Sequence, residues 1–217
     1  MNKLILLLGI SLILGSCEKN ILRGGGDIKT EIRDTDNFNA ITVSGNAKVV
    51  ITQGSEYKVE IKGYANLLNY YSSRVSNKTL KLGYRDNVNV RNDNIEVFIT
   101  MPELRGISVS GIANIDINGS FPEVPEMVAE ISGSGNVDYN GTGSAQVFKL
   151  IISGSGEINA FDLLAKTVNV NISGNGTGRV FAEEKLNVEI SGNAKVYYKG
   201  SPLINSNISG NGELIKN

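Results

Sequence analysis

The sequence contains no histidine and no tryptophan, and Cys17 is its only cysteine. A chain without histidine and with a single thiol cannot build the zinc sites or nucleophilic triads that depend on those residues. It cannot form an internal disulfide either, so the fold must be held by an apolar core and by hydrogen bonds. We therefore predict that the protein is not an enzyme and that it holds no metal and no cofactor.

An excess of charge of either sign is also missing, since 21 lysine and arginine residues face 22 aspartate and glutamate residues. No basic field exists to attract nucleic acid, which we therefore do not expect as a partner. The apolar run over residues 4–14 is about half of the ~20 residues that a membrane-spanning helix needs. The glycine-rich stretches lack the lysine and hydroxyl pair of a phosphate-binding loop.

The apolar run belongs to a segment with the features of a secretory signal, because Lys3 precedes it and small residues follow it. Its end, Leu14-Gly15-Ser16-Cys17, resembles the lipobox of bacterial lipoproteins. This resemblance implies that residues 1–16 are a lipoprotein signal peptide and that Cys17 is lipidated. The protein is then anchored to a membrane of the cell envelope, which we expect to be the outer membrane. The face on which it is displayed, periplasmic or outer, is left open.

Residues 17–36 have the composition of a spacer between the lipid and a folded domain. They include Gly24-Gly25-Gly26 among polar residues, which predicts a flexible tether. We expect a single domain over residues 37–217. Within it, residues 37–105 are a less regular half and residues 106–217 carry regular repeats.

A repeated segment is the most informative pattern in the chain: an apolar residue is followed by serine, glycine, a residue that is polar in every copy except Ile112, and glycine or alanine. Seven copies centre on Gly45, Gly111, Gly133, Gly154, Gly174, Gly192 and Gly210. The last five gaps shrink from 22 through 21 and 20 to 18 and 18 residues, a period typical of stacked coils. We predict an all-β fold that is a parallel β-helix, a solenoid with about 18–22 residues in each coil.

Apolar and polar residues alternate around each copy, as in strands with one buried face. Coils stacked at the ~4.8 Å strand spacing would place equivalent residues of successive copies in one interior column. The expected column is Ile131, Ile152, Ile172, Ile190 and Ile208. Paired small residues such as Gly133 and Gly135 are expected at an inner corner that has no room for side chains.

Two points of the architecture stay open at this stage. An antiparallel meander, with the glycine-serine segments as hairpin turns, would show the same alternation. The 66 residues from Gly45 to Gly111 would fit three coils of 22, but for residues 52–105 hairpins fit equally well, with a turn at Ser76-Asn77-Lys78. In either case we expect this half to cap one end of the solenoid. At the other end we expect either self-association or protection of the last coil by Glu213 and Lys216.

The segments ISGSGN, ISGSGE, ISGNGT, ISGNAK and ISGNGE, behind a lipobox, resemble the head GIN domain of auto-transporter adhesins. The resemblance covers most of the chain. It implies a right-handed, single-stranded β-helix, a location in the cell envelope and an adhesive role. It supplies no catalytic motif that could be transferred to this chain.

One outward column is the most promising place for a ligand. The repeat predicts that Asp116, Asp138, Asn159 and Arg179 stack on successive coils, and Tyr197 is the best outward aromatic in the repeats. We take these five residues as a possible ligand-binding face. A solvated polar ladder is the simpler interpretation. The enzymatic alternative is a polysaccharide lyase or hydrolase that uses Asp116 and Asp138 with Arg179, since β-helix lyases carry aspartate and basic residues on such a face.

The sequence as a whole favours a lipid-anchored, non-catalytic binding or structural module, adhesin-like in character. Its partners would be the membrane, through Cys17, and a protein or glycan ligand. A self-assembling surface scaffold, joined through the ends of the solenoid, is a further alternative.

Overall fold

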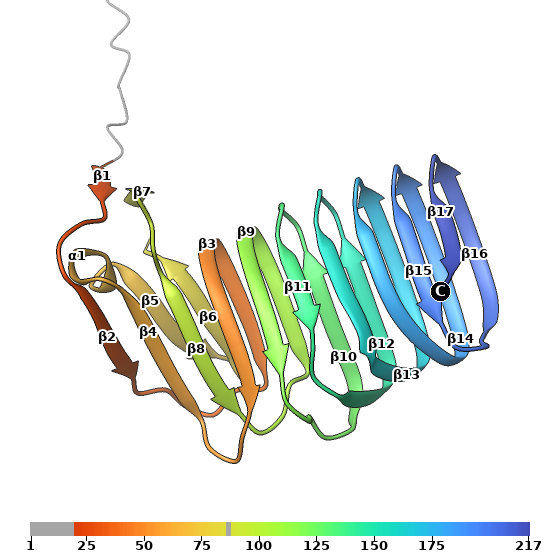
Figure 1. Ribbon diagram of the computed structural model, residues 1–217, viewed down its shortest axis with the longest axis horizontal. Coiled ribbons are helices and arrows are strands. Elements are labelled where there is room, and N and C mark those ends of the chain that lie inside the picture. The colour runs from red at the N-terminus through yellow and green to blue at the C-terminus, as the bar shows by residue number, and fades with distance from the viewer. Residues whose placement is uncertain (1–19, 86–87) are drawn as a thin grey trace, which may run out of the picture.

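The computed structural model describes residues 20–85 and 88–217 (Figure 1). The signal segment and Cys17 lie outside the described residues. Nearly every described element is a strand, and the one helix among them is α1 (Ala65–Leu68). In the part of the chain that is described, no helix has the length and apolar character needed to cross a membrane.

The elements divide into two groups along the chain. The first contains β1 (Asn20–Arg23), β2 (Ile28–Arg33), β3 (Ala40–Gln53), β4 (Lys58–Tyr64), β5 (Tyr71–Ser76), β6 (Thr79–Tyr84), β7 (Val88–Arg91) and β8 (Glu96–Met101). The second contains β9 (Gly106–Asn118), β10 (Val124–Ile131), β11 (Asn136–Tyr139), β12 (Gly143–Ile152), β13 (Glu157–Gly174), β14 (Thr177–Gly192), β15 (Lys195–Lys199), β16 (Leu203–Gly210) and β17 (Glu213–Lys216). Strands of the second group lie side by side along the long axis of the molecule (Figure 1).

All pairings within the second group are parallel, and they form two ladders. The first ladder runs β9, β10, β12, β13, β14, β16. The second runs β9, β11, β13, β14, β15, β17. The long strands β9, β13 and β14 belong to both ladders because each continues around a corner of the coil. The pairings of β9, β10, β12, β13 and β11 therefore close into a barrel-like ring.

The pairings confirm the all-β fold and the parallel direction of the strands in residues 106–217, and they exclude the antiparallel meander there. The register also confirms the interior column, since Ile131 lies opposite Ile152 and each later isoleucine lies opposite the next. These isoleucines are almost completely buried except Ile208, which is 38% exposed on the last strand of its ladder. Each repeat thus packs its isoleucine against those of the adjacent repeats.

The corner glycines have no space for a side chain. A Cβ atom at Gly154 would lie 2.1 Å from the carbonyl oxygen of Gly133, which is the equivalent glycine one coil earlier. A Cβ atom at Gly156 would lie 2.8 Å from a methyl carbon of Ile131. The expected inner corner is therefore confirmed, and backbone-to-backbone contact is its physical cause.

The N-terminal half combines parallel and antiparallel strand pairings. Strands β5 and β6 are an antiparallel hairpin whose two turn residues, Asn77 and Lys78, have φ angles of 51° and 57°. Two successive positive φ angles are the geometry that matches a hairpin to the twist of its strands. Strand β4 is antiparallel to β8, whereas β3 is parallel to β6, β8 and β9.

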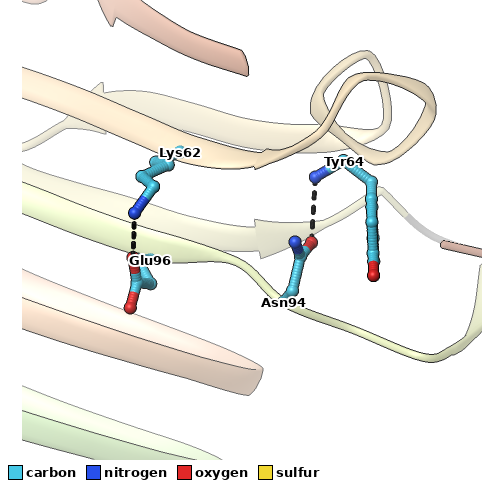
Figure 2. A network of polar contacts seen from close by, with 4 residues as sticks. All are labelled: Lys62, Tyr64, Asn94 and Glu96. Carbon is cyan, nitrogen blue, oxygen red and sulfur yellow. Dashed lines mark hydrogen bonds and ion pairs between the residues drawn. The ribbon is translucent and has the colours of Figure 1, made fainter. Parts of the chain in front are cut away.

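The antiparallel cap is tied to its neighbours by polar contacts (Figure 2). Lys62 of β4 lies 3.1 Å from the carboxylate of Glu96 on β8. The backbone N–H of Tyr64 donates to Oδ1 of Asn94 at 2.9 Å. These contacts fix β4 against β8 at the point where the regular stack ends.

The tether assigned to residues 17–36 requires correction. Strand β2 pairs with β4 along its whole length, and β1 pairs with β7. The Arg33 side chain also donates to the carbonyl of Leu68 at 2.8 Å. Folded structure therefore begins before residue 37, because β2 covers the edge that β4 would otherwise expose.

Substitution of a corner glycine should destabilise the whole stack. Gly154→Ala forces a methyl group against the Gly133 carbonyl oxygen, and we expect a loss of about 1–3 kcal/mol in the free energy of unfolding, as for other overpacked sites. The matched control is Gly25→Ala, because no atom lies within 4 Å of a Cβ atom there. Urea unfolding of both variants measures the difference, and equal stability would contradict the close-contact account.

The protein should lose stability in alkaline solution. Burial raises the pKa of Tyr139 to about 12, and burial together with the Asp93 carboxylate raises the pKa of Tyr71 and Tyr84. The contribution of each buried tyrosine to the free energy of unfolding is fully present below ~10, the tyrosine pKa in the unfolded chain. It is lost as the pH rises through the pKa of that tyrosine in the folded protein. Tyr139→Phe should therefore recover about 1 kcal/mol at about pH 11 relative to wild type. Denaturant unfolding at pH 8 and pH 11 tests this, and an unchanged pH dependence in the variant would refute it.

Candidate ligand-binding faces

The outward column predicted from the repeat is present on the second ladder. Asp116 lies opposite Asp138, which lies opposite Asn159 on the next strand. Asn159 lies opposite Arg179, and Arg179 lies opposite Tyr197. The five residues come from β9, β11, β13, β14 and β15, and all are half-buried. We call this set the Asp116–Tyr197 row.

The contacts within the row differ between its two ends. The side-chain amide of Asn159 donates to Oδ1 of Asp138 at 3.5 Å, and Oδ1 of Asn159 is buried without a hydrogen-bond partner. The guanidinium of Arg179 lies 5.2 Å from the ring centroid of Tyr197 and donates to the Glu157 carboxylate. One end is therefore acidic, while the other presents a cation held over an aromatic ring.

The row is not arranged as a metal centre. Among residues 20–85 and 88–217, no group of three or more acidic side chains gathers in a way that could hold an ion. Arg179 is already engaged by Glu157 and Tyr197. The arrangement can offer hydrogen-bond donors and acceptors to a ligand along five strands.

The first ladder carries a groove that the sequence interpretation did not identify. It is open to solvent, has a volume of about 480 Å³ and crosses β12, β13, β14 and β16. Its polar side chains are Lys149, Asn169, Asn171, Asn187, Glu189, Asn205 and Asn207. We call it the asparagine groove.

Strand register explains the composition of the asparagine groove. One column runs Lys149, Asn169, Asn187 and Asn205, and a parallel one runs Asn171, Glu189 and Asn207. In the sequence these residues stand one and three positions before the isoleucine that precedes Ser-Gly. That spacing could have identified the columns, but it could not show that the surface is hollowed.

Hydrogen bonds between strands hold the groove side chains in place. The Asn187 amide donates to Oδ1 of Asn169 at 2.7 Å, and the Asn171 amide donates to Glu189 at 3.4 Å. A side-chain amide has two donor hydrogens and two acceptor lone pairs, so one ladder bond leaves capacity for a ligand. Asn205 and Asn207 are exposed on β16. The groove is thus a regular array of amide groups, of which Asn169, Asn171 and Asn187 are held by hydrogen bonds.

A second asparagine ladder follows the corner of the coils. Asn211 donates to Asn193 at 2.9 Å, and Asn193 donates to Asn175 at 3.2 Å. Asn46 is outside this ladder, because its register partner is Ile112. The amide-to-amide bonds of Asn175, Asn193 and Asn211 connect successive repeats at the corner.

Comparisons with known proteins point to one group. Residues 37–202 match the family described as "Putative auto-transporter adhesin, head GIN domain". A crystal structure of a "putative adhesin" from Bacteroides fragilis is 27% identical, with a TM-score of 0.72, and the match covers 90% of this chain and 99% of that one. No curated protein matches the chain.

Two further crystal structures share the fold at lower identity. A "putative lipid binding protein" from Parabacteroides distasonis is 22% identical with a TM-score of 0.64, and the match covers 91% of this chain and 100% of that one. A "putative adhesin" from Parabacteroides merdae is also 22% identical with a TM-score of 0.56, and covers 91% and 99%. At this identity the likeness shows the fold alone.

Proposed function

Because the chain belongs to the family of the auto-transporter adhesin head GIN domain, we propose that it is a non-catalytic, adhesin-like binding module of the bacterial cell envelope. The proposed architecture is a right-handed, single-stranded β-helix of about 18–22 residues per coil. The parallel ladders and their closure through the long strands support this winding. Such a stack has long, rigid faces on which side chains repeat at the strand spacing of ~4.8 Å.

The asparagine groove is the observation that carries the proposal. Ladder bonds hold the amides of Asn169, Asn171 and Asn187, so little rotamer freedom of these side chains is lost when a ligand binds. Lys149, which forms an ion pair with Glu126 at 2.8 Å, and Glu189 add one charge of each sign to the same surface. Amide, carboxylate and ammonium groups match the donors and acceptors of sugar hydroxyls, and we therefore assign the groove to a glycan.

The Asp116–Tyr197 row is the second binding face of the proposal. Tyr197 offers an aromatic surface beside the cation of Arg179. The polysaccharide-cleaving alternative would need Arg179 free to act with Asp116 and Asp138, whereas Glu157 holds it. The descriptions of the family and of the similar structures name adhesins and a lipid-binding protein and no reaction.

The anchor of the proposal is Cys17, three residues before β1. Three residues span at most ~11 Å, so lipid on Cys17 would hold the β1 end of the molecule near the membrane. The opposite end of the stack, with β16 and β17, then points away from it (Figure 1). This orientation presents the asparagine groove to the surroundings.

Removal of the anchor should release the protein. Cys17→Ser leaves no thiol for acylation, and several acyl chains are what make anchoring durable. We expect the wild-type protein in the membrane fraction with incorporated fatty acid, and Cys17→Ser without label and outside that fraction. Metabolic labelling with an alkyne fatty acid, followed by separation of the membrane fraction, measures the incorporated lipid and the location of both proteins. Equal labelling of the two proteins would contradict lipidation at residue 17.

Groove variants should lose glycan binding without losing the fold. We expect Asn171→Ala with Asn187→Ala to weaken binding of the full-length protein to immobilised glycans about tenfold or more, since each lost hydrogen bond costs about 0.5–1.5 kcal/mol. The matched control is Asn175→Ala, which also removes one ladder bond but lies at the corner. An array of bacterial and host glycans provides the probe. Glycan binding that survives in the double variant would overturn the assignment of the groove, and a wild-type protein that binds no glycan on the array would overturn the assignment to a glycan.

A further inference from the structure

The two ends of the stack differ in the side chains on the inner side of their edge strands. At the N-terminal end, β2 sets Lys29, Glu31 and Arg33 opposite the inner positions of β4. Glu31 and Arg33 form an ion pair of 2.8 Å. Charged side chains on the inner side of an edge strand oppose pairing with another chain. This end is therefore protected.

The C-terminal end has the opposite character. Inner positions of β16 are Ile204, Ser206 and Ile208, which lie opposite the buried Leu186, Val188 and Ile190. Ile204 is 39% exposed and Ile208 is 38% exposed. Among the described residues, β16 pairs only with β14. An uncharged edge strand with exposed core residues is a site for β-strand addition.

The sequence of β16 is complementary to itself in one antiparallel register. When two copies are centred on Ser206, Ile204 of one copy lies opposite Ile208 of the other. Side chains alternate between the two faces of a strand, so two residues at equal distances from Ser206 lie on the same face. In this register inner residues of one copy therefore lie opposite inner residues of the other, and outer residues opposite outer residues. A single two-fold axis through Ser206 then closes the interface without further addition of copies.

The outer face of the same register is complementary as well. Asn205 of one copy lies opposite Asn207 of the other, and amide pairs across strands donate and accept reciprocally. Both residues line the asparagine groove. The grooves of two copies would therefore join into one continuous surface.

The second edge strand does not share this property. Lys216 of β17 lies opposite Tyr198 at an inner position, and a charge there disfavours pairing. Glu213 of β17 lies 3.4 Å from Lys195 within the same molecule. The interface is accordingly confined to β16.

From these observations we propose that the protein forms a two-fold symmetric dimer through antiparallel pairing of β16 with β16 of a second copy, centred on Ser206. The partner is a second copy because the β16 edge matches itself in both its inner and its outer residues. The dimer joins two asparagine grooves and places the two N-terminal ends far apart, so two copies anchored through Cys17 would pair from facing membranes. It does not depend on the ligand that the groove binds.

Cysteine crosslinking of the full-length protein tests the register. Ser206→Cys should give a covalent dimer on mild oxidation, because directly opposite residues of antiparallel strands have Cα atoms ~4.5–5.5 Å apart, within the range of a disulfide. The matched control is Ser209→Cys, exposed on the same strand but opposite Leu203 of the second copy in this register. Crosslinking of Ser209→Cys equal to that of Ser206→Cys would overturn the proposed register.

An inward charge on β16 tests the interface itself. Ile204→Lys imitates the protection seen on β2, and we expect loss of the covalent dimer when it is combined with Ser206→Cys. Light scattering of the protein without introduced cysteines should show the mass of two copies for wild type and of one copy for Ile204→Lys. Thermal unfolding confirms that the variant is folded. A wild-type mass of one copy at all concentrations, or a dimer unaffected by Ile204→Lys, would refute the proposal.

Discussion

From Gly111 to Gly210, the glycine that follows serine in each repeat lies against the carbonyl oxygen of the equivalent glycine in the preceding repeat, at a separation that admits no Cβ atom. This contact fixes how the coils lie on one another, because a shift of one residue would bring a side chain against the neighbouring backbone. From that register follow the isoleucine column, the hydrogen bonds between coils and the rows of outward side chains. A single coil of about 20 residues could not bury a core by itself.

The same register decides which polar residues meet. The Asp116–Tyr197 row arises because each member has the same place in its repeat, and the asparagine groove arises in the same way on the other ladder. Ladder bonds between adjacent asparagines hold donors and acceptors at regular intervals. A repeated core thus produces repeated surfaces, which suit a binding module that contacts an extended ligand.

The two ends of the molecule differ in structure and in the residues that they expose. Antiparallel strands close the N-terminal end and place charged residues along its edge. Strand β16 leaves isoleucine side chains partly exposed at the other end. If lipid at Cys17 holds the first end at the membrane, the second end and the asparagine groove are the parts that meet other molecules.

Much of this arrangement could be predicted because the repeat is local and regular. The sequence determined the all-β character, the interior column from Ile131 to Ile208 and the alignment of Asp116 with Asp138 and Arg179, since a fixed period places equivalent residues at equivalent positions. It did not determine whether adjacent strands run parallel or antiparallel, because an antiparallel meander keeps the same alternation of apolar and polar residues. Only the observed pairings decided that point.

The tertiary structure alone decided the parts that have no period. Strand β2 pairs with β4 across about 30 intervening residues, and nothing near residues 28–33 distinguishes such an edge strand from a tether. The ion pair of Arg179 with Glu157 and the hollow of the asparagine groove depend on how adjacent strands twist and on which surface is curved inward. Periodicity specifies which residues share a face, whereas the shape of that face is set by packing between coils.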